Sequence, residues 1–204
     1  FPGRGHLWLA PLIEDPYNPN QAYLAGGGVT GGNHLFHLTV ENGSMNYTEK
    51  PYNFNNTITA MGYSPIDPRN RYVLTYYGNF YHSNDDGNNW QMSSAFDGPD
   101  AHYFYGSTIW ASQSTSGMVI IGGSGYSNPP IYISYDHGAT FSSLMQGLPN
   151  TLIYELTGTP DDTYLFAATE LGPYVYITDE EEWTELAGIS APDQTYWSVE
   201  YIPE

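Results

Sequence analysis

The chain has 204 residues, and its 22 Asp and Glu outweigh 4 Lys and Arg, which gives a formal net charge of −18. Nucleic acids and anionic membrane surfaces are bound by clustered Lys and Arg, so this composition excludes both as partners. Cysteine is absent, which excludes disulfide scaffolds and thiol nucleophiles. No apolar run approaches the roughly 20 residues that a membrane-spanning helix needs, so we expect no membrane insertion.

Four similar units follow one another along the chain. Each begins with a short apolar stretch that we predict as a strand, at residues 9–13, 58–63, 108–111 and 152–156. In three units a proline turn lies next to this strand, at residues 14–20, 66–70 and 159–162. Pro restricts φ and Asp or Asn caps a turn through its side chain, so each turn ends one strand before the next begins. A second apolar strand, a turn containing glycine, and a third strand of alternating aromatic and polar residues complete the pattern.

A closing aromatic residue ends each unit and sets the period of the repeat. These residues are Tyr47, Trp90, Phe141 and Trp183, with separations of 43, 51 and 42 residues. A period of roughly 40 to 50 residues with several short strands is typical of β-propeller blades. We therefore predict an all-β propeller with about four blades of four-stranded antiparallel sheets.

We place the blades at approximately residues 7–55, 56–100, 105–148 and 151–188, and the start of a further blade at residues 195–204. An open stack of blades leaves two apolar end faces exposed, and propellers usually close with roughly four to eight blades. We therefore expect this chain to be part of a larger propeller, completed by further sequence or by another chain. A small closed ring is the alternative.

Two loops share the pattern Ser-x-Asp-x-Gly-x-[Asn/Thr]-aromatic. An Asp at the third position can accept several turn N–H groups, Gly at the fifth allows positive φ, and the aromatic ring fills the space between sheets. The pattern resembles the Asp-box, or bacterial neuraminidase repeat, of sialidases, sortilin-type receptors and xyloglucan hydrolases. The residues that carry it are Ser83, Asp85, Gly87 and Trp90, then Ser134, Asp136, Gly138, Thr140 and Phe141.

A second likeness lies in the last third of the chain. Residues 147–150 (GLPN) and 166–176 (FAATELGPYVY) are similar to phrases of large secreted propeller proteins of Bacteroidetes, which often carry a type IX sorting domain. This resemblance implies an extracellular or cell-surface location.

The resemblance also implies that the Asp-box carboxylates stabilise hairpins on the outer rim, so we assign Asp85 and Asp136 to the scaffold. We expect no cofactor and no metal site. Ca²⁺ stays open as an alternative near residues 84–88, 97–100 or 161–162, although no EF-hand spacing is present.

Enzymatic activity is left uncertain, with no residue assigned as catalytic. A sialidase would need an arginine triad that grips the substrate carboxylate, whereas Arg69 and Arg71 lie two residues apart in one predicted turn and Arg4 lies near the terminus. A xyloglucanase-like hydrolase needs two carboxylates across a cleft, roughly 5 to 10 Å apart. Acidic residues in or near predicted strands are Glu14, Asp15, Glu155, Glu170 and Glu200.

Aromatic residues exceed what the closing positions need, and exposed rings could contact a ligand. The candidates are Trp110, Tyr126 and Trp197, and the loop at residues 125–130 is the strongest because it is long, proline-rich and carries Tyr126. We therefore predict a non-catalytic, secreted or cell-surface binding or assembly module for a protein or a glycan. The alternatives are an extracellular glycoside hydrolase, xyloglucanase-like or sialidase-like, with carboxylates partly outside this chain, and a structural repeat of a surface filament or adhesin.

Overall fold

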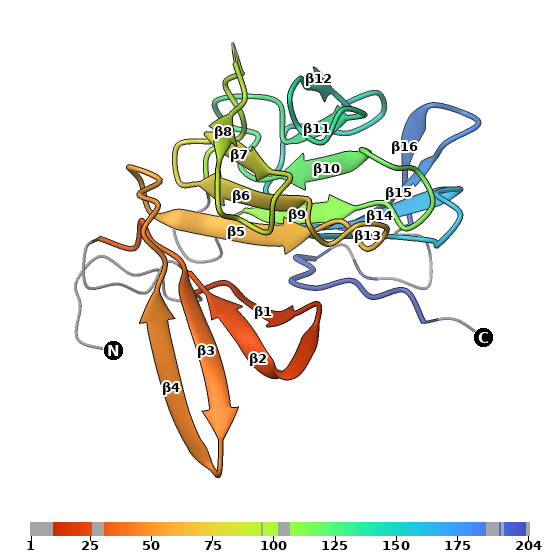
Figure 1. Cartoon of the computed structure of the whole chain (residues 1–204). Coiled ribbons are helices and arrows are strands. Elements are labelled where there is room, and N and C mark those ends of the chain that lie inside the picture. The colour runs from red at the N-terminus through yellow and green to blue at the C-terminus, as the bar shows by residue number, and fades with distance from the viewer. Residues whose placement is uncertain are drawn as a thin grey trace.

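The computed structural model describes residues 10–25, 31–94, 96–101, 107–186, 192 and 194–202. Within these residues the chain forms sixteen strands and no helix, and the strands make four separate four-stranded antiparallel sheets (Figure 1). In each sheet the strands lie side by side in chain order. The prediction of an all-β fold built from four-stranded antiparallel sheets is confirmed. No helix in the described part of the chain is long and apolar enough to cross a membrane.

Each sheet is an up-and-down meander. The first contains β1 (Leu12–Asp15), β2 (Asn18–Leu24), β3 (Phe36–Glu41) and β4 (Ser44–Glu49). The second contains β5 (Ile58–Tyr63), β6 (Arg71–Thr75), β7 (Phe80–Ser83) and β8 (Gln91–Met92). The third contains β9 (Thr108–Ala111), β10 (Val119–Gly122), β11 (Ile131–Ser134) and β12 (Ser142–Ser143). The fourth contains β13 (Ile153–Gly158), β14 (Tyr164–Thr169), β15 (Pro173–Ile177) and β16 (Glu182–Glu185).

The sheets pack face to face in chain order, with their first strands adjacent. Strand β1 contacts β5, β5 contacts β9, and β9 contacts β13. A separate apolar core fills each of the three spaces between successive sheets. Because every interface is made of apolar side chains removed from water, each sheet is stabilised mainly by its neighbours.

The middle sheets are buried on both faces. In β6, Val73 packs towards the first sheet, whereas Tyr72 and Leu74 pack towards the third. In β10, Ile120 packs towards the fourth sheet and its neighbours Val119 and Ile121 towards the second. Successive side chains of a strand point to opposite faces, so a strand between two cores needs a continuous apolar run. This requirement accounts for the apolar sequences of β6 and β10.

The first sheet differs from the others in its outer hairpin. Strands β3 and β4 have six residues each, whereas β8 and β12 have two. Every residue of β4 is exposed. Val40 and Met45 lie directly opposite each other in this hairpin and are 52% and 58% exposed. Figure 1 shows the hairpin extending away from the other three sheets.

Residues 195–204 are predicted as the start of a further blade, and their described part, residues 195–202, forms no strand but contacts the fourth sheet. The backbone N–H of Tyr196 donates to the carbonyl of Thr169, at 3.0 Å. The N–H of Val199 donates to the carboxylate of Glu155 on β13, at 2.9 Å. The first three residues of the first predicted unit, 7–9, lie outside the described residues.

Candidate functional site

The meander of each sheet defines two opposite rims of the molecule. We call hairpin rim the side that carries the turns between first and second strands and between third and fourth strands. We call loop rim the side that carries the loops between second and third strands and the connections from one sheet to the next. The two Ser-x-Asp-x-Gly hairpins, which the sequence assigns to the scaffold, lie on the hairpin rim. The loop at residues 125–130 lies on the loop rim.

The first Ser-x-Asp-x-Gly hairpin is closed by hydrogen bonds within itself. The hydroxyl of Ser83 donates to Asp85 at 2.8 Å and accepts the N–H of Gly87 at 2.9 Å. Asp85 also accepts the N–H and the side-chain amide of Asn89. Hydrogen bonds from the Asn89 side chain, its backbone and Ser83 lower the pKa of Asp85. Trp90 is buried and its indole N–H donates to the carbonyl of Gly87 at 3.0 Å.

The second hairpin repeats this arrangement residue for residue. Ser134 donates to Asp136 at 2.8 Å and accepts the N–H of Gly138 at 2.8 Å. Asp136 accepts both the N–H and the hydroxyl of Thr140. Burial alone would raise the pKa of Asp136, but the bonds from Thr140 and Ser134 outweigh it and the pKa is lowered. Phe141 stacks on Phe96 in the core between the second and third sheets.

Side chains on the hairpin rim also link successive sheets. The hydroxyl of Tyr17 donates to Asp86 at 3.0 Å, which joins the first sheet to the second. The hydroxyl of Tyr72 lies 3.0 Å from Nδ1 of His137, which joins the second to the third. Buried Asp162 in the fourth sheet accepts hydroxyl groups from the third, those of Ser112, Ser114 and Thr115. Both carboxylate oxygens of Asp162 therefore have protein donors, and Asp86 accepts through Oδ1.

No group of three or more His, Asp or Glu side chains in the described residues is arranged to hold a metal ion. Asp161, one of the predicted alternative Ca²⁺ ligands, accepts the hydroxyl of Thr159 and the N–H of Thr163. These bonds lower its pKa to about 2, the side-chain bond from Thr159 being the largest cause.

On the loop rim, the loop at residues 125–130 is held from both sides. Its Tyr126 is 66% exposed, and the phenol hydroxyl donates to the carboxylate of Glu170 in the fourth sheet. This hydrogen bond raises the pKa of Tyr126. On the other side, the side-chain amide of Asn128 donates to the carbonyl of Gly98 at 3.0 Å. The ring is therefore exposed but fixed in place, which reduces the entropy lost when a ligand binds.

A shallow hollow lies beside this ring. It combines one aromatic ring, a thioether, hydroxyl and amide groups, and no cationic side chain. The residues that line it are Gly125, Tyr126, Ser127, Asn128, Pro129, Met145 and Asn150. Apolar surface with a few fixed polar groups is the usual composition of a small-molecule site.

Glu170 connects this hollow to a second aromatic residue. While its carboxylate holds Tyr126, its carbonyl accepts the hydroxyl of Thr195 at 3.1 Å. Two residues further on, Trp197 is 52% exposed and its ring lies 4.6 Å from that of Tyr154. Two of the three predicted ligand contacts, Tyr126 and Trp197, therefore lie on segments that meet at Glu170.

The third predicted contact, Trp110, lies elsewhere. It is half-buried on β9 and packs against the core between the third and fourth sheets. A Cβ on Gly158 would lie 2.6 Å from its ring, so the indole occupies space that this glycine leaves open. Gly158 ends β13 at the hairpin rim, on the side of the molecule opposite the loop at residues 125–130.

The predicted acidic candidates lie at two places: Glu14 and Asp15 on the first sheet, and Glu155, Glu170 and Glu200 where residues 194–202 contact the fourth sheet. Glu14 accepts the hydroxyl of Tyr63 at 3.1 Å, and Asp15 is buried and accepts the N–H groups of the turn that follows it. Glu155 accepts Val199, and Glu200 is exposed. Asp100 has the property expected of a general acid, because burial, aided by the charge of Asp97, raises its pKa. It pairs by a β-bridge with Ser124, at the start of the loop that carries Tyr126.

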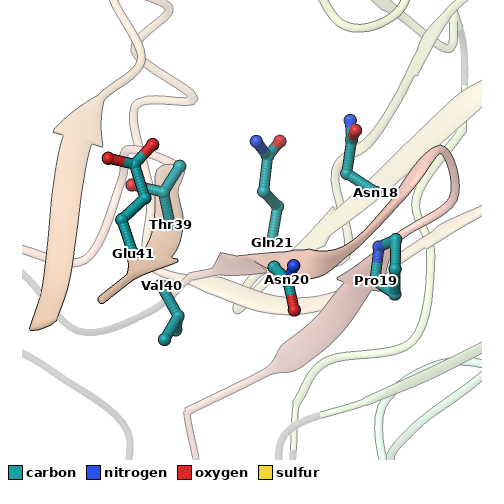
Figure 2. Close-up of a pocket in the computed structure, with 7 residues that line it drawn as sticks. All are labelled: Asn18, Pro19, Asn20, Gln21, Thr39, Val40 and Glu41. Carbon is teal, nitrogen blue, oxygen red and sulfur yellow. The ribbon is translucent and has the colours of Figure 1, made fainter. Parts of the chain in front are cut away.

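A polar hollow on the first sheet is a further surface feature (Figure 2). Asn18, Gln21, Thr39 and Glu41 project from the same side of β2 and β3, whereas Val40 projects from the other side. Asn18 and Glu41 are exposed and Gln21 and Thr39 are half-buried, and no aromatic ring lines the hollow. The hollow therefore lacks the apolar surface that the Tyr126 hollow offers.

Neither a protein-family model nor a curated protein sequence matches the chain. Solved structures do. The GH74 enzyme of Niastella koreensis superposes with a TM-score of 0.63 at 19% identity, over 86% of this chain and 29% of that one. The GH74 xyloglucanase of Xanthomonas campestris gives 0.65 at 15% identity, over 91% and 31%. YCF48 bound to D1 peptide gives 0.56 at 13% identity, over 86% and 53%.

These similarities show the fold. The chain is a β-propeller arc, and its four sheets are four blades, as the 40 to 50 residue period predicts. It spans about a third of the GH74 chains that it matches, and the arc fits part of a larger propeller.

Proposed function

We propose that this protein is a non-catalytic binding module that recognises a neutral glycan on the loop rim. The observation that carries the proposal is the exposed ring of Tyr126, fixed by Glu170 above a hollow of amide and hydroxyl groups. An aromatic face covers the apolar side of a sugar ring, and the amides of Asn128 and Asn150 are donors and acceptors for its hydroxyls. With a net charge of −18 and no cation in the hollow, an acidic glycan is disfavoured.

The similarity to GH74 structures, one of them a xyloglucanase, supports a glycan over a protein as the ligand. The Asp-box resemblance and the scarcity of Lys support a secreted or cell-surface protein, in which further blades from additional sequence or another chain complete the ring. A protein ligand is the alternative, and YCF48 bound to D1 peptide is its precedent among the similar structures.

The test is isothermal titration calorimetry with neutral oligosaccharides, xyloglucan fragments first, and with acidic oligosaccharides as the comparison. Tyr126→Ala is expected to weaken binding at least tenfold, the loss of about 1.4 kcal/mol of stacking energy. Tyr135→Ala is the matched control, because Tyr135 is 64% exposed but lies in the Ser-x-Asp-x-Gly hairpin on the opposite rim. Equal affinity of wild type and Tyr126→Ala, or no binding of any neutral glycan, contradicts the proposal.

A second candidate function, glycoside hydrolysis, is favoured by Asp100. Burial raises its pKa, and its β-bridge to Ser124 brings it to the base of the Tyr126 loop. A general acid alone is insufficient, because hydrolysis needs a second carboxylate, which in this reading comes from further blades. Release of reducing ends from xyloglucan by the natively purified protein, abolished by Asp100→Asn, would favour the hydrolase. Binding without release favours the non-catalytic module.

A further inference from the structure

In the second blade, the loop between β6 and β7 is a tight turn on the loop rim. The N–H of Gly78 donates to the carbonyl of Thr75 at 2.9 Å, and the N–H of Thr75 donates to the carbonyl of Asn79 at 3.0 Å. Gly78 has a positive φ of 74°, which glycine adopts without strain. Tyr77 lies within this turn and is 60% exposed. The turn therefore fixes the backbone of Tyr77 while its side chain faces solvent.

The fourth blade repeats this turn. The N–H of Thr169 donates to the carbonyl of Gly172 at 3.1 Å, and the N–H of Gly172 donates to Oγ1 of Thr169 at 3.2 Å. Thr169 corresponds to Thr75, because each pairs with the first residue of the first strand of its blade. Two residues after this threonine, Leu171 has the position of Tyr77 and is 44% exposed. The same position on the loop rim thus presents an exposed apolar side chain in both blades.

The loop that carries Tyr126 lies between these two turns and contacts both sides. On the side of the second blade, Gly78 packs so closely on Gly98 that a Cβ would collide with the Gly98 carbonyl oxygen. That carbonyl accepts the side-chain amide of Asn128. On the side of the fourth blade, Tyr126 donates to Glu170 in the repeated turn. The surface of the loop rim is therefore continuous from the second blade to the fourth.

Two exposed tyrosine rings stand on this surface, and each is held by a neighbour. Tyr77 packs edge to face with Tyr76, at 5.3 Å between ring centroids. Tyr126 is held through its hydroxyl by Glu170. The two tyrosines belong to successive blades, and neighbouring sheets pack about 10 Å apart, so the rings are separated by about this distance or more. A single sugar residue is too short to cover both rings.

We propose that Tyr77 forms a second aromatic subsite and that the ligand is an extended chain of neutral sugars, laid along the loop rim from the second blade towards the fourth. The inference rests on the glycan binding proposed above and specifies the length of the glycan. Tyr126 stacks on one sugar and Tyr77 on another, at least two residues along the chain. Asn128, on the side of its loop that faces Gly98, supplies polar groups for the hydroxyls of the intervening sugar.

Because both rings are held in place, the second stacking contact requires little further loss of conformational entropy. A chain that covers Tyr77 and Tyr126 therefore binds more tightly than one that covers Tyr126 alone. The affinity of the protein rises with the length of the glycan until both rings are covered and is then constant.

The test is isothermal titration calorimetry with two linear series, cello-oligosaccharides and malto-oligosaccharides, from disaccharide to hexasaccharide. In at least one series, the affinity of the wild type should rise about fivefold or more between the disaccharide and the hexasaccharide, as expected from one further stacking contact. Tyr77→Ala should bind the disaccharide like the wild type but lose most of this rise. Tyr126→Ala should weaken binding at every length.

Two control variants separate the ring of Tyr77 from other effects. Tyr77→Phe keeps the ring and should retain the full rise with length. Tyr135→Ala removes a comparably exposed ring from the opposite rim and should behave like the wild type. Circular dichroism verifies the fold of each variant. If Tyr77→Ala fails to fold, Tyr77→Asn takes its place, because asparagine is favoured in turns.

The failure of this inference differs from the failure of the proposed function. If neutral oligosaccharides of every length and kind fail to bind, both are overturned. Equal affinity for disaccharide and hexasaccharide, or a rise with length that Tyr77→Ala leaves unchanged, overturns the Tyr77 subsite while glycan recognition at Tyr126 stands. Binding of xyloglucan fragments but of neither linear series also overturns the subsite, because recognition then depends on the branches and not on the length of the chain.

Discussion

The phenol oxygen of Tyr72 and Nδ1 of His137 lie 3.0 Å apart and join the second blade to the third. Tyr72 is almost completely buried on β6, and burial raises its pKa strongly. His137 occupies the position before Gly138 in the Ser-x-Asp-x-Gly hairpin, with a positive φ of 59°. Tyr17 contacts Asp86, the equivalent residue of the preceding hairpin. In both pairs, a tyrosine of one blade contacts the residue that precedes the hairpin glycine of the next blade.

Removing this hydroxyl should loosen the second and third blades without leaving a cavity. Tyr72→Phe is expected to lower the free energy of unfolding by about 1 kcal/mol, the usual net contribution of one hydrogen bond. Urea unfolding followed by tryptophan fluorescence measures the change. Tyr77→Phe is the control, because Tyr77 is 60% exposed and should stay within about 0.5 kcal/mol of the wild type. Equal stability of Tyr72→Phe and wild type would show that the bond contributes nothing.

Because His82 has a lowered pKa, we expect the free energy of unfolding to decrease in mild acid. Burial lowers its pKa, the charge of Asp136 opposes this shift and that of His137 adds to it. Because the folded pKa lies below the unfolded value, about 6.5, the unfolded chain binds the proton more tightly. The contribution of His82 is therefore fully present above about pH 6.5 and decreases as the pH falls below it.

Unfolding midpoints between about pH 7.5 and pH 5 should decline for the wild type and decline less for His82→Asn. This window lies above the range in which Asp85 and Asp136 titrate, since hydrogen bonds lower the pKa of both. The carboxylates therefore contribute a second loss of stability only below about pH 4. Parallel pH profiles of wild type and His82→Asn would exclude His82 as the cause.

The repeat itself could be predicted from the sequence because its determinants are local. Continuous apolar runs predict strands buried on both faces, and β5 and β9 have the bounds expected from such runs. The spacing of Ser83, Asp85 and Gly87 predicts a hairpin whose bonds all close within a few residues. These patterns depend on neighbours in the chain, so no tertiary information is needed.

The candidate site depends on contacts between distant residues, and these could not be predicted. Tyr126 and Glu170 are 44 residues apart and come from different blades. Glu170 was a candidate acid by its sequence position, but its contact with Tyr126 has no local signature. Tyr47 also differs from the other closing aromatic residues, Trp90, Phe141 and Trp183, which lie in or against the cores between blades. It is 51% exposed and its ring packs edge to face with that of Phe36, because the long β3–β4 hairpin extends beyond the core.

Glu170 is expected to position Tyr126 for the glycan binding proposed above. Glu170→Gln keeps an acceptor for the phenol and should retain most of the affinity, whereas Glu170→Ala releases the ring and should weaken binding several-fold. Calorimetry with the same neutral oligosaccharide gives the comparison. Glu200→Ala removes an exposed carboxylate from the adjacent terminal segment and serves as the charge-matched control. Identical affinities of Glu170→Ala and Glu200→Ala would contradict a positioning role.

Substituting two glycines, Gly43 and Gly138, distinguishes two costs in the free energy of unfolding: that of a positive φ and that of crowding between blades. Gly43 and Gly138 both have positive φ, 76° and 85°. A Cβ at Gly43 would meet no atom within 4 Å, whereas one at Gly138 would lie 2.1 Å from the ring of Phe80. Gly43→Ala should therefore cost about 1 kcal/mol, from positive φ alone. Gly138→Ala should cost about 1–3 kcal/mol more, because Phe80 or the hairpin must shift.

Urea unfolding of the two variants measures this difference, and Phe80→Leu provides the internal check. Phe80 packs edge to face against Phe141, at 4.9 Å between ring centroids. Phe80→Leu on its own should therefore lower the stability of the protein. In the Gly138→Ala background, however, it removes the clash, and the two substitutions together should cost less than the sum of their separate effects. Additive costs would show that Gly138 is needed only for its backbone conformation, and that close approach of the hairpin to the second blade is not what requires glycine there.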